Sequence, residues 1–164
     1  MALTNGYLQF FLGFLLLITM GGNMWSGARK ARSVRVFYGL MGSDITMLFA
    51  GSADNFLLYA TSDSPEKYIW LEGLLSGISD ASYFCVLGLF ILYLDVYGRD
   101  DDKPVGILAL IGVIVSVIYA IFWLVSDFNG AIYTRDAETV MRGALYYIGQ
   151  LGGYITGILS IVIV

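Results

Sequence analysis

Three aspartates inside long apolar segments are the residues of this chain most able to do chemistry. Asp44 and Asp54 lie in the segment Val36–Ala60, and Asp80 lies in Tyr68–Tyr93. An ionised carboxylate at mid-bilayer costs roughly 2.5–3.5 kcal/mol, and protonating an aspartate at pH 7 costs about 4 kcal/mol. Because the two costs are so similar, the partners around each carboxyl group decide its charge state.

Helical spacing predicts that these acids lie on polar helix faces. At 100° per residue, Asp44, Gly51 and Asn55 share one stripe, and Asp54 lies beside it. Small and polar residues of the next apolar segment share a second face: Gly73, Ser76, Gly77, Asp80 and Tyr83. Such faces are typical of helix–helix contacts rather than of contacts with lipid.

The short connection at Ser64-Pro65 relates the depths of the two helices. Counting outward from it, Asp54 is level with about Ser76, and Asp80 with about Phe49. We therefore predict one polar cluster in the outer half of a bundle, consisting of Asp54, Asn55, Ser76 and Asp80.

The chemistry of this cluster has three interpretations. Neither apolar segment contains Lys or Arg, so an ionised cluster would need a cation, water or an amine ligand. Protonated acids would instead donate hydrogen bonds to serine, asparagine or backbone carbonyls and serve packing alone. A ligand- or signal-sensing site and an ion or proton pathway are the functional alternatives, because acids within a membrane are usually functional.

Composition excludes several classes of function. The chain has no histidine and one cysteine, which excludes histidine-based catalysis, Cys/His zinc sites and intrachain disulfides. Cys85 falls inside an apolar segment, where a thiol behaves as a small hydrophobic side chain. Consecutive acids at 100–102 lack the spacing of calcium ligands. We predict no enzyme activity, no metal, no cofactor and no nucleic-acid partner, since there is no basic tail either.

The segments that hold these residues predict an all-α integral membrane protein. Five apolar runs, each about the length that crosses ~30 Å of hydrocarbon, predict helices at 7–26, 36–61, 68–97, 105–126 and 141–164. The hydrophobic fraction of 58% agrees. We expect a single polytopic bundle over 1–164 whose main partner is the lipid bilayer.

The distribution of basic residues predicts the orientation of the bundle. The first and third loops contain six Lys and Arg (Arg29, Lys30, Arg32, Arg35, Arg99 and Lys103), whereas the second and fourth contain three (Lys67, Arg135 and Arg142). Basic loops stay in the cytoplasm, so we predict the N-terminus outside and Val164 inside. Aromatic residues including Trp70 and Trp123 fall near the predicted interfaces, which amphipathic rings favour.

The C-terminus and the glycine pattern each suggest a larger assembly. The chain stops at Ile161–Val164 without a polar flank, so we expect the front part of a longer protein. Gly149, Gly153 and Gly157 recur every fourth residue. This spacing permits close helix packing within the bundle or in a homodimer.

Several segments match a pattern found in bacterial receptors. They are the basic stretch Ala28–Arg35, an acid two turns before the outer end of the second helix (Asp54), a tyrosine-rich third helix ending at Asp95, and an outer loop with Asn129-Gly130, Tyr133 and Arg142-Gly143. The whole chain thus resembles the N-terminal membrane sensor region of bacterial diguanylate cyclases and sensor histidine kinases. That region typically has seven helices and places its tyrosine close to the Arg-Gly pair, whereas Thr134–Met141 separates them here.

The resemblance implies a sensor module in the bacterial cytoplasmic membrane that relays an outer or intramembrane stimulus to a cytoplasmic effector. The candidate sensing residues are Asp44, Asp54, Asn55, Ser76, Asp80 and Arg142. A small transporter or channel component and a purely structural membrane subunit are the two alternatives.

Overall fold

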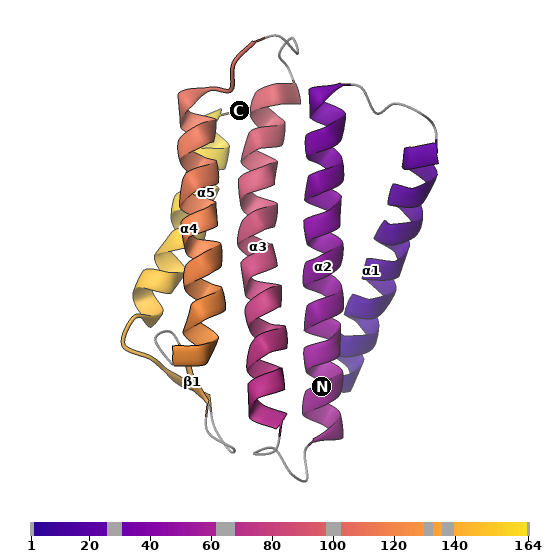
Figure 1. The fold of residues 1–164 in the computed structure, drawn as a ribbon, viewed down its shortest axis with the longest axis vertical. Helices are drawn as coiled ribbons and strands as arrows, with labels where there is room; N and C mark the ends of the chain where they lie inside the picture. Colours follow the sequence, from indigo (N-terminus) through magenta and orange to yellow (C-terminus); the bar gives the residue numbers. More distant parts are fainter. Residues whose placement is uncertain are drawn as a thin grey trace.

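A computed structural model describes residues 2–25, 31–61, 68–97, 103–129, 133–135 and 140–163, with backbone alone at 25, 127–129, 133–135, 140–142, 160 and 163. These residues form five helices and a β-hairpin (Figure 1): α1 Ala2–Trp25, α2 Arg32–Ala60, α3 Ile69–Tyr97, α4 Ile107–Asn129, β1 Tyr133–Arg135, β2 Val140–Arg142 and α5 Tyr146–Ile163.

The first four helices stand in a row in chain order, alternating up and down (Figure 1). Short connections make sequential helices antiparallel neighbours. Helix α5 lies behind the row and packs on both α4 and α3. Helix α1 meets α2 near the N-terminus of the chain and diverges from it toward Trp25 (Figure 1). The glycines of α1 reflect this divergence. Cβ atoms at Gly6 and Gly13 would contact side chains of α2, whereas one at Gly21 would have no atom within 4 Å.

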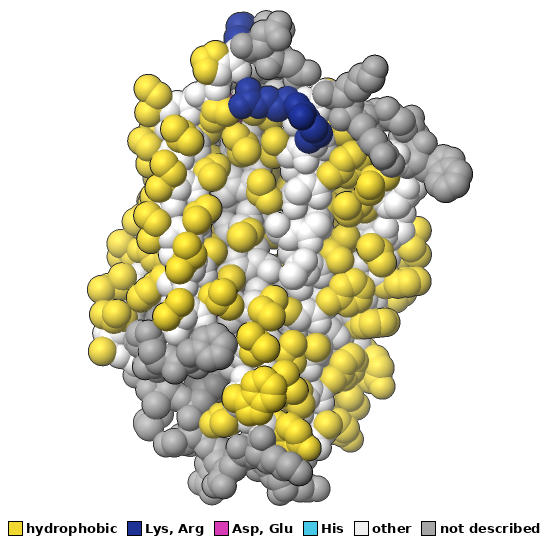
Figure 2. All heavy atoms as spheres, in the orientation of Figure 1, with side chains coloured by type: hydrophobic (Ala, Val, Ile, Leu, Met, Phe, Trp, Pro, Cys, Tyr) yellow, Lys and Arg dark blue, Asp and Glu magenta, His cyan; other side chains and the backbone are white. Residues whose placement is uncertain are grey.

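Within the described residues, three helices are long and apolar enough to cross a membrane: Ala2–Met24, Ile69–Tyr97 and Ile107–Ser126. This finding indicates a membrane protein whose apolar helices contact lipid. Figure 2 shows apolar side chains along the length of the helices, with Lys and Arg side chains at one end of that face.

Helix α4 shows why lipid, and not water, suits this surface. Its buried face consists mostly of small residues: Ala109, Gly112, Ser116 and Ala120. Its exposed face carries large aliphatic side chains, among them Ile107, Leu110, Ile114, Val117, Ile118 and Ile121. A water-soluble helix has the reverse pattern, since its large apolar residues drive folding by leaving water. Small residues inside allow close backbone approach, which is how helices associate in lipid.

Glycine sets the separation of α3 and α4. A Cβ atom at Gly88 would lie 2.8 Å from Ser116 Cβ, and one at Gly112 would lie 3.0 Å from the Ile91 side chain. Near the C-terminal end of α3, the backbone N–H of Gly106 donates a 2.8 Å hydrogen bond to Oδ2 of the buried Asp95. This bond satisfies a backbone donor at the start of α4.

Several predicted helix boundaries differ from the structure. The predicted helix at 141–164 begins too early, because α5 begins only at Tyr146. Residues 140–142 instead form β2, antiparallel to β1, with Tyr133 opposite Arg142. Both strands contain β-favouring aromatic or β-branched residues, and a four-residue connection suits a hairpin.

Three other helix boundaries also differ from the prediction. Helix α1 begins at Ala2 rather than at 7, α2 at Arg32 rather than at 36, and α4 extends to Asn129 rather than 126. Arg32 and Arg35 therefore lie in the first turn of α2 and not in a loop. Cys85 is exposed on α3. The predicted turn at Ser64-Pro65, the acids at 100–102 and the basic residues Arg29, Lys30, Lys67 and Arg99 lie outside the described residues.

Candidate functional site

A cavity of about 340 Å³ lies between α3, α4 and α5. Its lining combines one carboxylate, one amide, three aromatic rings and two glycines: Asp80, Gln150, Tyr83, Phe84, Trp123, Gly149 and Gly153. The volume falls at the lower end of the range typical of small-molecule sites.

The floor of the cavity is a rigid group of aromatic rings. Phe84 and Trp123 are only 3% and 6% exposed, and they stack with centroids 6.2 Å apart at 30°. Tyr119 stacks on Phe84 at 5.5 Å. Tyr83 lies edge-on to Phe84 at 79° and is 44% exposed, so it forms the rim. Offset stacks and edge contacts are favourable aromatic geometries, so these rings hold one another in place.

Glycines in α5 create the opposite wall. The indole N–H of Trp123 donates to the carbonyl oxygen of Gly149 at 3.4 Å, an approach that a bulky residue at 149 would hinder. A Cβ atom at Gly153 would meet nothing within 4 Å. The cavity is thus partly the space that a side chain at 153 would occupy.

The polar groups of the cavity come from two different helices. Asp80 projects from α3 and Gln150 from α5, and both are partly buried. Helices α3, α4 and α5 contain no Lys or Arg in their sequences. The carboxyl group of Asp80 is therefore the main source of charge that these three helices bring to the cavity.

Helix geometry places the cavity near one end of the bundle. At 1.5 Å per residue, Trp123 lies about 9 Å from the end of α4, and Gly149 about 5 Å from the start of α5. Both ends adjoin the β-hairpin, which connects α4 to α5. The cavity is therefore close to the connection that carries Arg142 in its second strand.

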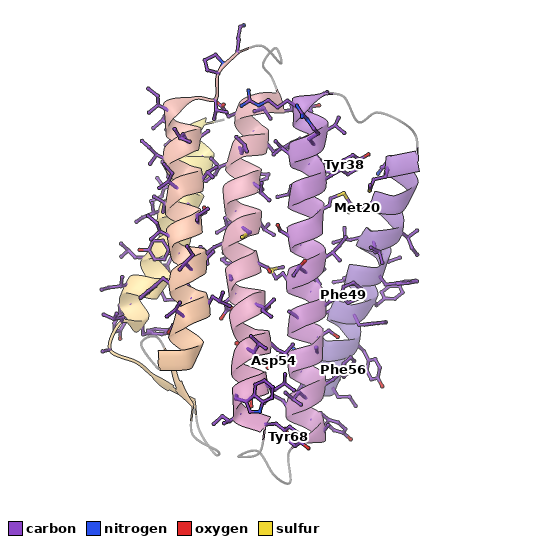
Figure 3. All side chains as sticks on the ribbon, in the orientation of Figure 1. Met20, Tyr38, Phe49, Asp54, Phe56 and Tyr68 are labelled. Atoms are coloured by element: carbon purple, nitrogen blue, oxygen red, sulfur yellow. The ribbon has the colours of Figure 1, made fainter. Side chains whose placement is uncertain are left out.

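A second group of polar contacts joins α1 to α2. Asn55 Nδ2 donates to Gln9 Oε1 at 3.0 Å and to the Gly51 carbonyl at 2.8 Å, and Ser52 Oγ donates to the Gly6 carbonyl at 2.8 Å. Phe49 and Phe56 point toward α1 (Figure 3), where they pack on Phe10 and Tyr7. Asn55 therefore has a packing role between α1 and α2, at a different interface from Asp80.

The predicted depth relation between α2 and α3 is confirmed. A Cβ atom at Gly51 would lie 3.2 Å from Ser79 Oγ, and Ser79 Oγ donates to the Met47 carbonyl at 3.3 Å. Because the two helices are antiparallel and Gly51 lies beside Ser79, Asp54, three residues further along α2, is level with Ser76, three residues earlier in α3. Figure 3 shows Asp54 on the side of α2 toward α3, and its Oδ1 atom is buried.

The other predicted sensing residues, Ser76, Asp44 and Arg142, lie at different places in the fold. Ser76 lies one turn from Asp80 on α3 and is partly buried. Asp44 is about 15 Å along α2 from Asp54, so it does not share their level. Arg142 lies in β2, opposite Tyr133, and only its backbone is described. The strand pairing thus brings together the two residues that the intervening segment separates in sequence.

Sequence reasoning missed three residues of these sites. For Trp123 the sequence predicted only a depth near the membrane interface, and its burial against Phe84 was not predicted. Gln150 and Gln9 were not singled out, although each is an isolated amide in an apolar helix and such residues mark helix contacts. Among the described residues, no group of three or more acidic, Cys or His side chains could hold a metal ion.

The chain matches no family model, no curated protein and no solved structure. Among the described residues, those that line the cavity between α3, α4 and α5 are best suited to bind a small ligand.

The Asn55–Gln9 contact gives a prediction about the attachment of α1. Replacing Asn55 with leucine should lower the free energy of unfolding by about 0.5–1.5 kcal/mol, the range of hydrogen bonds between membrane helices. Thermal unfolding in a mild detergent measures the change. Gln9→Leu should cost a similar amount, and the double variant should cost less than the sum because the two residues share one bond. Strict additivity would contradict the contact.

Proposed function

We propose that this chain is the sensing module of a bacterial signalling receptor in the cytoplasmic membrane. The observation that carries the proposal is the cavity between α3, α4 and α5, which combines a carboxylate and an amide with an aromatic floor. In this proposal all five helices span the bilayer, the N-terminus is outside, and the stimulus is a small molecule that binds in the cavity.

The arrangement of basic residues supports this orientation. Arg32 Nη1 donates to the backbone carbonyl of Lys103 at 2.9 Å, so the segment that precedes α4 reaches the start of α2. Arg35 lies one turn further along α2. Basic residues gathered at one end favour a cytoplasmic location for that end. The cavity adjoins the hairpin at the opposite end of α4, which corresponds to the outer side.

Helix α5 is suited to carry the signal. One of its ends lines the cavity through Gly149, Gln150 and Gly153, and its other end leads to Val164 at the proposed cytoplasmic side. Its packing is open at Gly153 and Gly157, which have no atom within 4 Å of their Cβ positions, whereas Thr156 on another face of the helix is buried. A ligand that binds one position of α5 more tightly than another shifts the population between them.

The proposal is tested first by the reading frame beyond Val164. A frame that continues into further helices and a kinase or cyclase domain supports a receptor, and an immediate stop codon contradicts it. Output of that effector is then measured in cells for the wild type and for Gly153→Leu, which should fill the cavity. We expect the variant to have a constant output that no stimulus changes.

Gly157→Leu is the matched control for this experiment. It adds the same side chain to the same helix, one turn away from the cavity lining, at another position without close neighbours. It should respond to stimuli like the wild type. Equal, stimulus-insensitive output in all three proteins would contradict the proposal. Ion flux through proteoliposomes that disappears in Asp80→Asn would favour the transporter instead.

A further inference from the structure

We propose that the cavity between α3, α4 and α5 binds a neutral, lipid-soluble carbonyl compound, whose carbonyl oxygen accepts hydrogen bonds from the Gln150 amide and the Tyr83 hydroxyl. This assignment rests on the sensing function proposed above. It specifies the chemical class of the stimulus and the phase from which the stimulus reaches the protein, both of which sensing alone leaves open.

The Gln150 side chain is the first argument for this class. It lines the cavity from α5 and is partly buried, and among the residues that the structure describes its amide group has no hydrogen-bond partner. An amide in an apolar environment is costly without a hydrogen bond, and lipid tails offer none. A ligand with a polar atom in the cavity would supply the missing partner.

The other polar groups of the lining differ in how they are engaged. The indole N–H of Trp123 donates to the Gly149 carbonyl oxygen at 3.4 Å, and Asp80 already takes part in an interaction within the protein. The Tyr83 hydroxyl, like the Gln150 amide, makes no hydrogen bond within the described part of the chain. Both of these open groups are neutral and can donate, and a carbonyl oxygen has two lone pairs with which to accept from them.

The surroundings of the cavity favour entry from the lipid. Tyr83 is 44% exposed on α3, and Tyr154, one turn after Gln150 on α5, is 70% exposed. In the proposed membrane arrangement both rings face lipid, so a molecule dissolved in the bilayer reaches the lining from the side. An uncharged molecule with apolar surface enters the bilayer readily, whereas a charged one is held back by the cost of losing its hydration.

The shape of the cavity limits the apolar part of the ligand. Phe84 and Trp123 are stacked on each other and almost fully buried, so they close the cavity and present little surface to a ligand. The more accessible wall consists of the Tyr83 ring and the backbone at Gly153, whose Cβ position has no atom within 4 Å. A compound with a single ring suits such a wall within a volume of about 340 Å³.

The test uses the whole chain reconstituted in lipid nanodiscs, with para-fluoroacetophenone and para-fluoro-α-methylstyrene as probes. The two molecules have nearly the same shape, and only the ketone has a carbonyl oxygen in place of a methylene group. Fluorine NMR measures the binding of each probe, and empty nanodiscs measure its partitioning into lipid. We expect a saturable change in the ketone signal beyond that in empty nanodiscs, with a dissociation constant about fivefold lower than that of the hydrocarbon.

Variants separate the hydrogen bonds of the site from its shape. Gln150→Met removes the amide and keeps the length of the side chain, so the dissociation constant of the ketone should rise toward that of the hydrocarbon. Tyr83→Phe removes only the hydroxyl and should also weaken the preference for the ketone. Gly153→Leu should abolish binding of both probes, and Gly157→Leu should change neither. Thermal unfolding of each variant verifies that it is folded.

Two results would overturn the inference. One is equal affinity for both probes in the wild type, which would mean that water and not a ligand satisfies Gln150. The other is a preference for the ketone that persists in both Gln150→Met and Tyr83→Phe, which would place its carbonyl group elsewhere. Either result leaves the sensing proposal standing if Gly153→Leu still fixes the effector output, so the two proposals can fail separately.

Discussion

Gly152→Leu is expected to release α5 from the bundle. A Cβ atom at this position would overlap the ring of Tyr119 on α4. That ring has little room to move, because it stacks on the buried Phe84 and makes an edge contact with Phe122. Overpacking usually costs 1–3 kcal/mol, and more where the neighbour cannot shift. We expect a loss of about 3 kcal/mol in the free energy of unfolding, measured by thermal denaturation in detergent.

Neighbouring glycines on α5 provide the controls. Gly157→Leu introduces the same side chain where no atom lies within 4 Å, so it should change the midpoint of thermal unfolding little. Gly152→Ala should cost much less stability in a Tyr119→Ala background than in the wild type, since the overlapping ring is then absent. Equal stability of Gly152→Leu and Gly157→Leu would show that Gly152 does not pack against the ring of Tyr119.

Gly88→Leu is expected to have the other large effect, at the crossing of α3 and α4. Its Cβ would lie 2.8 Å from Ser116 Cβ and 3.7 Å from the Val113 Cα atom. Because backbone lies directly behind the side chain, the helices would have to separate. We expect a loss of about 2–3 kcal/mol, and a thermal midpoint well below that of the wild type.

A double-mutant cycle tests the origin of this effect. Gly88→Ala should be destabilising by itself, and Ser116→Gly in the same chain should relieve it by removing the nearest atom. Gly42→Leu on α2 is the matched control, because its Cβ position has no neighbour within 4 Å. Additive effects of the two substitutions would show that residues 88 and 116 do not interact at the helix crossing.

The sequence by itself determined the class of fold and the approximate helices. Apolar runs of about 20 residues have one stable outcome in lipid, since every backbone polar group must be satisfied within the segment. The depth of Asp54 relative to Ser76 also followed from the sequence, because a short connection between two helices fixes their register. The helix expected to begin at 141 was wrong at its start, because strand pairing of Tyr133 with Arg142 depends on residues about nine positions apart.

Only the tertiary structure decided which polar residues share a site. Asn55 and Asp54 are adjacent in sequence, yet Asn55 bonds to α1 and Asp54 lies toward α3. Asp80 joins Trp123 and Gln150 instead. The physical reason is that periodicity defines a polar face on each helix but not the neighbour that the face meets. That neighbour is set by close contacts at a few glycines, such as Gly88 with Ser116 and Gly152 with Tyr119, between residues far apart in the chain.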